Sequence, residues 1–270
     1  MADDTDGKPL LERYRVLDAQ ARQSWAQLNR SPKVAATAVY DLRLALRVSR
    51  ILKRFIRKDP GFAAIEGALD RCYQATARVR DQQVELDLVR LLEQDGSCRT
   101  RPPSKAMKAR LLQETRQLEA EVAQLGLSGA LQGMDQAYSS LQRRRSEEQM
   151  QCKALRQARR FEVRMCERMH DALLGQADAD WHALRLAIKH YRFWVLTLAD
   201  WLPPAYSEQV NLLKPLQVAL GNYHDWVVLE ARLPELEGAP MDRWLPEVLR
   251  FKQASLELAR AQLEPLLKTF

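Results

Sequence analysis

The sequence lacks the features of a membrane or secreted protein. None of its apolar runs approaches the roughly 18 residues that a membrane-spanning helix needs, and residues 1–8 are polar and acidic rather than apolar as in a secretory signal. Because residues 1–8 carry no periodic apolar pattern, we expect them to form a disordered tail. These absences predict a cytoplasmic protein that has no membrane partner.

Cysteine is scarce and is never paired in the sequence. The four cysteines, Cys72, Cys98, Cys152 and Cys166, form no Cys-x-x-Cys motif, so zinc binding and dithiol redox chemistry are not indicated. We expect reduced thiols. The chain also lacks a His-Glu-x-x-His zinc helix and a glycine-rich phosphate loop. The sequence therefore predicts no metal site, no cofactor and no catalytic residues.

Strand-like alternation is nearly absent as well. Glycines and prolines cluster at breaks between long stretches of helical periodicity, for example at 59–61, at Gly221 and at 238–240. Ser31 followed by Pro32 is typical of a helix N-cap with proline at the first helical position. The pattern predicts an all-α fold of about eight or nine helices, several of them longer than about 20 residues.

Acidic residues are outnumbered by basic ones. The chain has 42 Lys+Arg and 35 Asp+Glu, a net charge of +7, and 46% of its residues are hydrophobic, which is enough for a core. A positive balance favours a polyanionic partner such as nucleic acid, polyphosphate or anionic lipid, and by itself it says nothing about the fold.

An internal repeat is the most informative feature that is present. The segment VYDLRLALRVSR begins at Val39, and WHALRLAIKHYR, which shares Leu-Arg-Leu-Ala with it, begins at Trp181. A second pair of segments follows in the same order: RDQQVELDLV begins at Arg80 and HDWVVLEARL begins at His224. Two ordered matches indicate a duplicated helical unit, with a chance likeness between amphipathic helices as the alternative.

Each repeated segment places cations on one face of a helix. Because a helix turns by about 100° per residue, positions i, i+3, i+7 and i+10 share an arc of roughly 80°. The first stripe is Tyr40, Arg43, Arg47 and Arg50, and the second is His182, Arg185, Lys189 and Arg192. A separate apolar stripe on the second helix consists of Leu184, Ile188, Tyr191, Val195 and Leu198. Neither basic stripe contains an acid, although like charges four residues apart cost about 0.2–0.5 kcal/mol each; this favours an anionic ligand over an ordinary solvated face.

More cations precede the second stripe. Lys153, Arg156, Arg160 and Arg164 form a one-sided row on the preceding helix, which we also expect to carry the arginines 143–145 at its start. The row is equally consistent with long side chains that cover apolar neighbours. The triple arginine favours a solvated helix start over a binding role.

The second half of the chain resembles the CHAD family (conserved histidine α-helical domain). Each half of a CHAD domain carries a pattern like His-x-x-Arg-x-x-x-Arg/Lys-x-x-Arg, followed by a segment like Leu-Gly-x-x-x-Asp. The residues from His182 to Arg192 fit the first pattern, and the residues from Leu220 to Asp225 fit the second. In the first half Tyr40 takes the histidine position, Ser49 replaces a frequently basic residue, and no Leu-Gly precedes Arg80-Asp81.

This resemblance implies a single domain over residues 9–268, with halves of about 9–125 and 130–268. It implies a helical bundle of two pseudo-symmetric halves around a basic groove or pore that binds inorganic polyphosphate, localising the protein to polyphosphate granules or sensing them. The residues implied to line the pore are Arg43, Arg47, Arg50, His182, Arg185, Lys189, Arg192 and Lys214, with His224, Lys153 and Arg160 as further candidates. Asp81 and Asp225 are expected to orient arginines by ion pairing, and His182 to gain charge below about pH 6.5.

Three other functions are weighed against polyphosphate binding. Some family members are fused to a triphosphatase marked by Glu-x-Glu-x-Lys, which is missing from this sequence, so we do not expect an enzyme. Nucleic-acid binding is disfavoured because the stripes lack interleaved aromatic residues for base stacking. A scaffold with a generic basic surface, which reaches granules through a helical partner, is the third alternative; the sequence does not specify protein partners.

Overall fold

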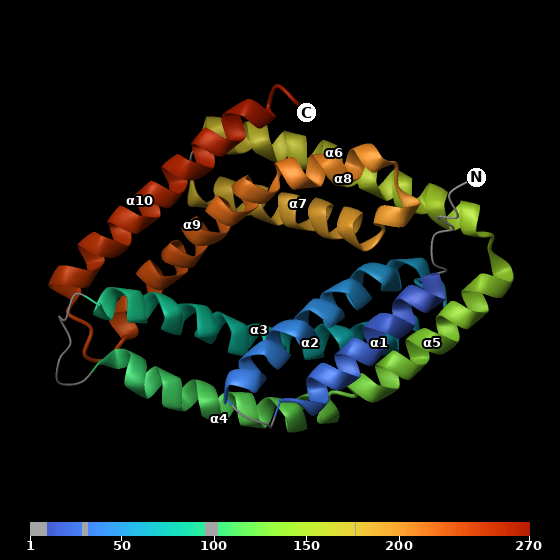
Figure 1. Cartoon of the computed structure of the whole chain (residues 1–270), viewed down its shortest axis with the longest axis horizontal. Helices are drawn as coiled ribbons and strands as arrows, with labels where there is room; N and C mark the ends of the chain where they lie inside the picture. The colour runs from blue at the N-terminus through green and yellow to red at the C-terminus, as the bar shows by residue number, and fades with distance from the viewer. Residues whose placement is uncertain (1–9, 29–31, 95–101, 176) are drawn as a thin grey trace, which may run out of the picture. The chain divides into compact units, whose positions relative to one another are not determined.

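The computed structural model describes residues 10–28, 32–94, 102–175 and 177–270 (Figure 1). Within these ranges the regular structure consists of ten α-helices and three short 3-10 helices, without strands. The prediction of an all-α fold is confirmed. No helix in these ranges combines the length and the hydropathy needed to cross a bilayer. The tail predicted at residues 1–8, the N-cap Ser31 and Cys98 lie outside the described residues.

The helices follow the breaks that glycine and proline mark, with two exceptions. In chain order they are α1 (Leu10–Ala26), α2 (Pro32–Leu52), α3 (Phe62–Glu93), α4 (Pro103–Gln124), α5 (Leu127–Arg144), α6 (Glu147–Gly175), α7 (Asp178–Thr197), α8 (Pro204–Leu212), α9 (Lys214–Arg232) and α10 (Met241–Leu266). Short 3-10 helices follow α2 (Lys53–Phe55), α7 (Ala199–Trp201) and α9 (Leu233–Glu235). As expected, α2 begins at Pro32.

The first exception is Gly221, which does not end a helix. It lies inside α9, where a glycine costs about 1 kcal/mol relative to alanine. Leu216, Leu220 and Tyr223 are buried along the same helix. Burial of such side chains is worth about 1.5–3 kcal/mol each, so the packing of α9 outweighs the preference of its glycine.

The second exception is the break between α5 and α6. Arg143 and Arg144 form the last turn of α5 and Arg145 caps it, so the triple arginine ends one helix and does not begin the next. Glu147 and Glu148 occupy the first turn of α6. Cations near a helix C-terminus and acids near a helix N-terminus both oppose the helix dipole favourably, and this charge change at 145–147 marks the boundary.

The chain divides into two compact units. Unit 1 contains Met1–Leu86 and Ala106–Met150, and unit 2 contains Asp87–Lys105 and Gln151–Phe270. The domain boundaries and the pseudo-symmetry inferred from the sequence stay predictions.

In unit 1, α1 lies along α2 and α5. The buried Tyr14 of α1 donates its hydroxyl hydrogen bond to the carbonyl of Leu131 in α5, and its ring centroid lies 5.0 Å from that of Tyr138. Between α4 and α5, Gly126 adopts φ +81°, a left-handed conformation that glycine tolerates, and this allows the short turn from one helix into the other. α1 is thus held against α5 on one side and packs on the other against α2, which carries the first basic stripe.

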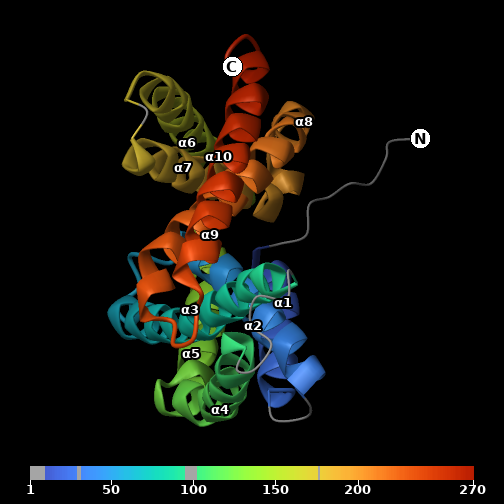
Figure 2. The same ribbon diagram turned by 90° about the vertical axis from the view of Figure 1, so that its left-hand side faces the viewer.

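In unit 2, α10 runs beside α9 (Figures 1 and 2). The rings of Trp226 on α9 and Phe251 on α10 stack with centroids 4.8 Å apart. The indole N–H of Trp194 on α7 donates to the carbonyl of Ala154 on α6 at 3.0 Å. The predicted apolar stripe of α7 is confirmed, since Leu184, Ile188, Tyr191, Val195 and Leu198 are all fully buried.

Candidate functional site

The second basic stripe lies on α7, turned away from the buried apolar stripe of the same helix. His182, Arg185, Lys189 and Arg192 are all half-buried. A long side chain in this position packs its stem against neighbours and keeps its charged end accessible. Core packing and cation presentation are therefore divided between two faces of α7, as the periodicity predicts.

Two histidines meet where α7 contacts α9. Nδ1 of His182 lies 3.2 Å from Nδ1 of His224, and the ring centroids are 4.7 Å apart. A neutral imidazole has one N–H donor and one acceptor nitrogen, so one Nδ1 carries the hydrogen and the other accepts it. The sequence repeat singled out both residues, and the structure brings them into direct contact.

The surroundings of this pair disfavour the imidazolium form. Burial and the charges of Arg185 and Lys189 lower the pKa of His182. Burial, followed by the charges of Arg185, His182 and Lys189, lowers the pKa of His224 to about 4. Both imidazoles are therefore neutral at pH 7. The expectation that His182 gains charge below about pH 6.5 is wrong for the protein by itself. Burial of the ring could not be read from the sequence, and the expectation left out the charges of Arg185 and Lys189 on the same face of the helix.

A cavity of about 260 Å³ lies beside the histidine pair. It is lined from α7 by Asp178, Ala179, Trp181, His182 and Arg185, and from α9 by Leu220, Tyr223, His224 and Val227. The side chain of Trp181 is fully buried, and its indole N–H has no hydrogen-bond partner among the described residues. A buried donor without a partner is costly, so Trp181 keeps a polar cost behind the wall of this cavity.

The acidic residue of the cavity is engaged by its neighbours. The Tyr223 hydroxyl donates a hydrogen bond to the Asp178 carboxylate, and Nζ of Lys252 on α10 lies 3.0 Å from the same carboxylate. The Tyr223 hydrogen bond is the main cause that lowers the pKa of Asp178. Lys252 also reaches Glu230 at 2.9 Å. Asp178 thus stays ionised and is held at the cavity edge.

The basic surface of unit 2 continues past the cavity. The guanidinium of Arg192 donates to the carbonyl of Val210 at 2.8 Å and to the side-chain oxygen of Gln217, both neutral partners. Lys214, the first residue of α9, is exposed and forms no ion pair among the described residues. Both cations therefore keep their charge uncompensated by these contacts.

The first basic stripe, on α2, has an aromatic partner. The guanidiniums of Arg43 and Arg50 both lie over the ring of Tyr73 on α3, with Cζ 4.4 Å and 4.3 Å from its centroid. Nη1 of Arg43 also donates to the Tyr73 carbonyl at 3.3 Å. Burial lowers the pKa of Arg43, while the exposed Asp81 acts on it in the opposite sense through its charge. Tyr73 was not recognised from the sequence.

Acidic residues from α3 neutralise the end of this stripe. Nε of Arg50 lies 2.7 Å from the carboxylate of Asp70. Lys53, which is buried, contacts Asp70 at 3.1 Å and Glu66 at 3.0 Å. Sequence reasoning missed these acids because they belong to another helix. Their i,i+4 spacing on one face of α3 was the signal that could have found them.

The repeat gives each of these contacts a counterpart. The second repeated segment begins at Arg80 in the first half and at His224 in the second. Tyr73 and Gln217 each lie seven residues before that start, and Asp70 and Lys214 each lie ten residues before it. The arginine that ends the stripe contacts Tyr73 and Asp70 in unit 1 and Gln217 in unit 2. An acid in unit 1 is therefore matched by a lysine in unit 2.

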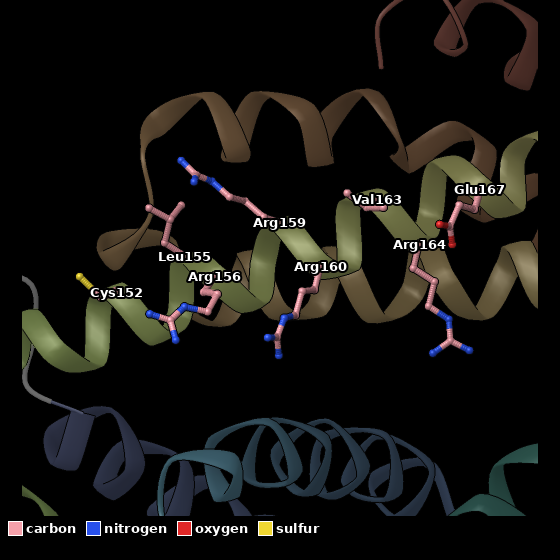
Figure 3. Close-up of a pocket in the computed structure, with 8 residues that line it drawn as sticks. All are labelled: Cys152, Leu155, Arg156, Arg159, Arg160, Val163, Arg164 and Glu167. Atoms are coloured by element: carbon pink, nitrogen blue, oxygen red, sulfur yellow. The ribbon is translucent and has the colours of Figure 1, made fainter.

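The arginines of α6 form a further basic surface. Arg156, Arg160 and Arg164 project from one side of the helix, and Arg159 projects from the opposite side (Figure 3). They line an open hollow of about 710 Å³. Lys153 and Arg160 are exposed, and neither lines the cavity beside the histidine pair. The structure thus separates these two candidates from that cavity.

Metal-ligand groupings are missing from the described ranges. No group of three or more His, Cys, Asp or Glu side chains there is placed to hold a metal ion. Cys72, Cys152 and Cys166 are free thiols.

Comparisons with known proteins agree on one fold. The family model of the CHAD domain matches residues 10–234. The structure is similar to the crystal structure of the CHAD domain from the plant Ricinus communis, with a TM-score of 0.63 and 14% sequence identity over 98% of this chain and 94% of that chain. At this identity the structural likeness concerns the fold alone. No curated protein matches the sequence.

Proposed function

The chain belongs to the CHAD domain family, and on that premise we propose that it binds inorganic polyphosphate. The observation that carries the proposal is the basic stripe of α7, which continues through Arg192 to Lys214 at the start of α9. Polyphosphate is a flexible chain of repeated anions without bases to read. A row of cations at helical pitch is therefore sufficient to bind it.

The types of cation in the stripe suit this ligand. Arginine offers two parallel N–H donors to phosphate oxygens, and lysine acts as a compact point charge. Unit 2 provides both types of cation, and Arg185 also lines its cavity. The neutral partners of Arg192 leave its charge available to an anion.

We assign the larger share of binding to unit 2. In unit 1 the last cation of the stripe already contacts Asp70, and two cations share the ring of Tyr73. An incoming phosphate must compete with the carboxylate for Arg50. In unit 2 the corresponding position is Lys214, which adds attraction instead of competition.

We further propose binding without catalysis. Asp178, the carboxylate that lines the cavity, accepts a hydrogen bond from Tyr223 and contacts Lys252, and its lowered pKa makes it a poor proton acceptor. The remaining polar groups of the cavity suit the holding of an anion. A protein with this activity would localise to polyphosphate granules or sense them.

Affinity as a function of salt tests the proposal. If about four phosphates are engaged and each contributes about 0.7 to the logarithmic slope, as in single-stranded nucleic acids, affinity should fall roughly 50-fold between about 50 and about 200 mM salt. A specific site should also retain long-chain polyphosphate when duplex DNA is present in excess.

A cation of unit 2 that lies outside the stripe provides the control. Arg168→Gln removes an α6 cation that already pairs with Asp171, and it should leave affinity unchanged. Displacement of polyphosphate by duplex DNA would instead support the alternative of a generic basic surface that binds nucleic acid.

A further inference from the structure

The contact between His182 and His224 limits how many protons the pair can hold. Because Nδ1 of one ring donates to Nδ1 of the other at 3.2 Å, the donating ring has one lone pair left, on its Nε2. A proton that binds there leaves the Nδ1 contact intact and creates a cationic N–H donor. A second proton would place two N–H groups against each other and break the contact. The pair therefore accepts one additional proton.

Charges from three helices surround this pair. Arg185 and Lys189 act on it from α7, and both lower the pKa of each imidazole. Tyr223 of α9 lines the same cavity but donates its hydroxyl to Asp178, which Lys252 of α10 also contacts. Arg260 of α10 lies over the ring of Trp181, with Cζ 5.7 Å from the centroid. The groups nearest the histidines are thus cationic, and the single acid of the cavity is already compensated.

An anion in the cavity would reverse this balance. A phosphate group beside Arg185 offsets the positive charge that keeps the imidazoles neutral, and its own negative charge favours an imidazolium. The volume of about 260 Å³ provides space for the same group, and Arg185 lines that space beside the two histidines.

We propose that the histidine pair takes up one proton, shared between His182 and His224, when a phosphate group of polyphosphate binds in this cavity. The proton comes from the solvent and binds to the remaining Nε2 lone pair of the donating ring, where the added anion stabilises the new N–H⁺. This inference rests on the proposed function and specifies how its affinity is regulated: polyphosphate binds more tightly as the pH falls.

The direction follows from proton linkage. The bound state has the higher imidazole pKa, so binding gains free energy as the pH falls through the pKa of the bound state and levels off below that of the free protein. Uptake of one proton limits the steepest change in affinity to about tenfold per pH unit. Unit 1 should not contribute, because Tyr40 and Arg80 occupy the positions equivalent to His182 and His224.

Calorimetry counts the proton directly. The full chain is titrated with long-chain polyphosphate at about pH 6 in two phosphate-free buffers that differ in ionisation enthalpy. Long chains are used because their internal phosphates are strongly acidic and do not titrate in this range. The difference in heat should correspond to about 0.5–1 proton taken up per site, and affinity measured from pH 7.5 to 5.5 should rise.

Two substitutions locate the proton. His224→Arg installs the residue found at the equivalent position of unit 1, so it should abolish both proton uptake and the pH response. If that variant does not fold, as judged by circular dichroism, His182→Gln should likewise abolish uptake. His190→Gln changes an exposed histidine farther along α7 and should retain the full uptake of the unchanged protein.

The outcomes separate this inference from the proposed function. Tight polyphosphate binding without proton uptake would overturn the inference and leave the function standing. Uptake that persists in His224→Arg would place the proton elsewhere and also overturn it. A lack of polyphosphate binding at every pH would overturn both.

Discussion

Units 1 and 2 carry similar rows of cations and present them to different neighbours. On α2 the row faces a tyrosine and an aspartate of α3, and on α7 it faces a histidine and a glutamine of α9. The row itself is the part that the repeat preserves. The facing helix decides what the last arginine of each row contacts: a carboxylate for Arg50 and neutral oxygens for Arg192.

The chemistry of the facing helix explains the difference. Lys53 is buried in unit 1, which is tolerable only because Asp70 and Glu66 accompany it. Once these acids are present, they also compensate Arg50. In unit 2 the positions of Asp70 and Glu66 are taken by Lys214 and Val210. Unit 1 therefore places acids against Lys53 and Arg50, whereas unit 2 has a lysine and a valine at those positions.

The largest expected effect comes from removing the middle of each row. We predict that Arg185→Ala with Lys189→Ala weakens polyphosphate binding by about 1 to 3 kcal/mol per lost charge-assisted contact, with little change in melting temperature. The matched pair Arg43→Ala with Arg47→Ala should weaken binding less and lower the melting temperature more, because Arg43 is committed to Tyr73.

Titration with polyphosphate and thermal melts of three proteins, the two double variants and the unchanged chain, measure both quantities in the same buffer. Equal losses of affinity from the two double variants would break the comparison, since they would show two equivalent stripes.

A smaller effect is expected from substitutions at Lys214 and Asp70, which occupy equivalent positions in the two units. Lys214→Asp brings to unit 2 the acid that compensates Arg50 in unit 1, and it should weaken binding by about 1 kcal/mol, the range for a partly screened charge. Asp70→Asn should strengthen binding by less than that and lower the melting temperature, because Lys53 then keeps only Glu66. If Asp70→Asn leaves both properties unchanged, the carboxylate does not control Arg50.

The smallest effect concerns the histidine position of unit 1. Tyr40 is 55% exposed, so its ring does not pack between helices, and Tyr40→His should leave the melting temperature unchanged. The new imidazole should raise polyphosphate affinity by less than about 1 kcal/mol and only below roughly pH 6.5, where histidine is protonated. A melting temperature that falls without a gain in affinity at acid pH would contradict this expectation.

Sequence periodicity was sufficient to predict the all-α fold and to identify the buried face of α7. Leu184 and Ile188 are buried because they recur at helical spacing, and that spacing is visible in one segment. The helix boundary at Arg145 was missed because charge, and neither glycine nor proline, marks it.

The contents of the site were only partly predictable, because they depend on pairs of helices. The repeat singled out His182 and His224, but their contact and their lowered pKa values arise from the register of α7 against α9. Asp70 and Tyr73 belong to α3, and the sequence of α3 alone does not show that these residues face the basic stripe of α2. Residues that act through a second helix require the fold to be known.

The indole in the cavity wall gives this protein a built-in optical reporter. Five of the six tryptophans belong to unit 2, namely Trp181, Trp194, Trp201, Trp226 and Trp244, and unit 1 contains Trp25. Ultraviolet emission of the unlabelled chain therefore comes mainly from unit 2. Because Trp181 lines the cavity, a charge that enters there changes the electric field on its ring and shifts its emission. Occupancy of this cavity can thus be followed by fluorescence without a dye, a tag or a modified ligand.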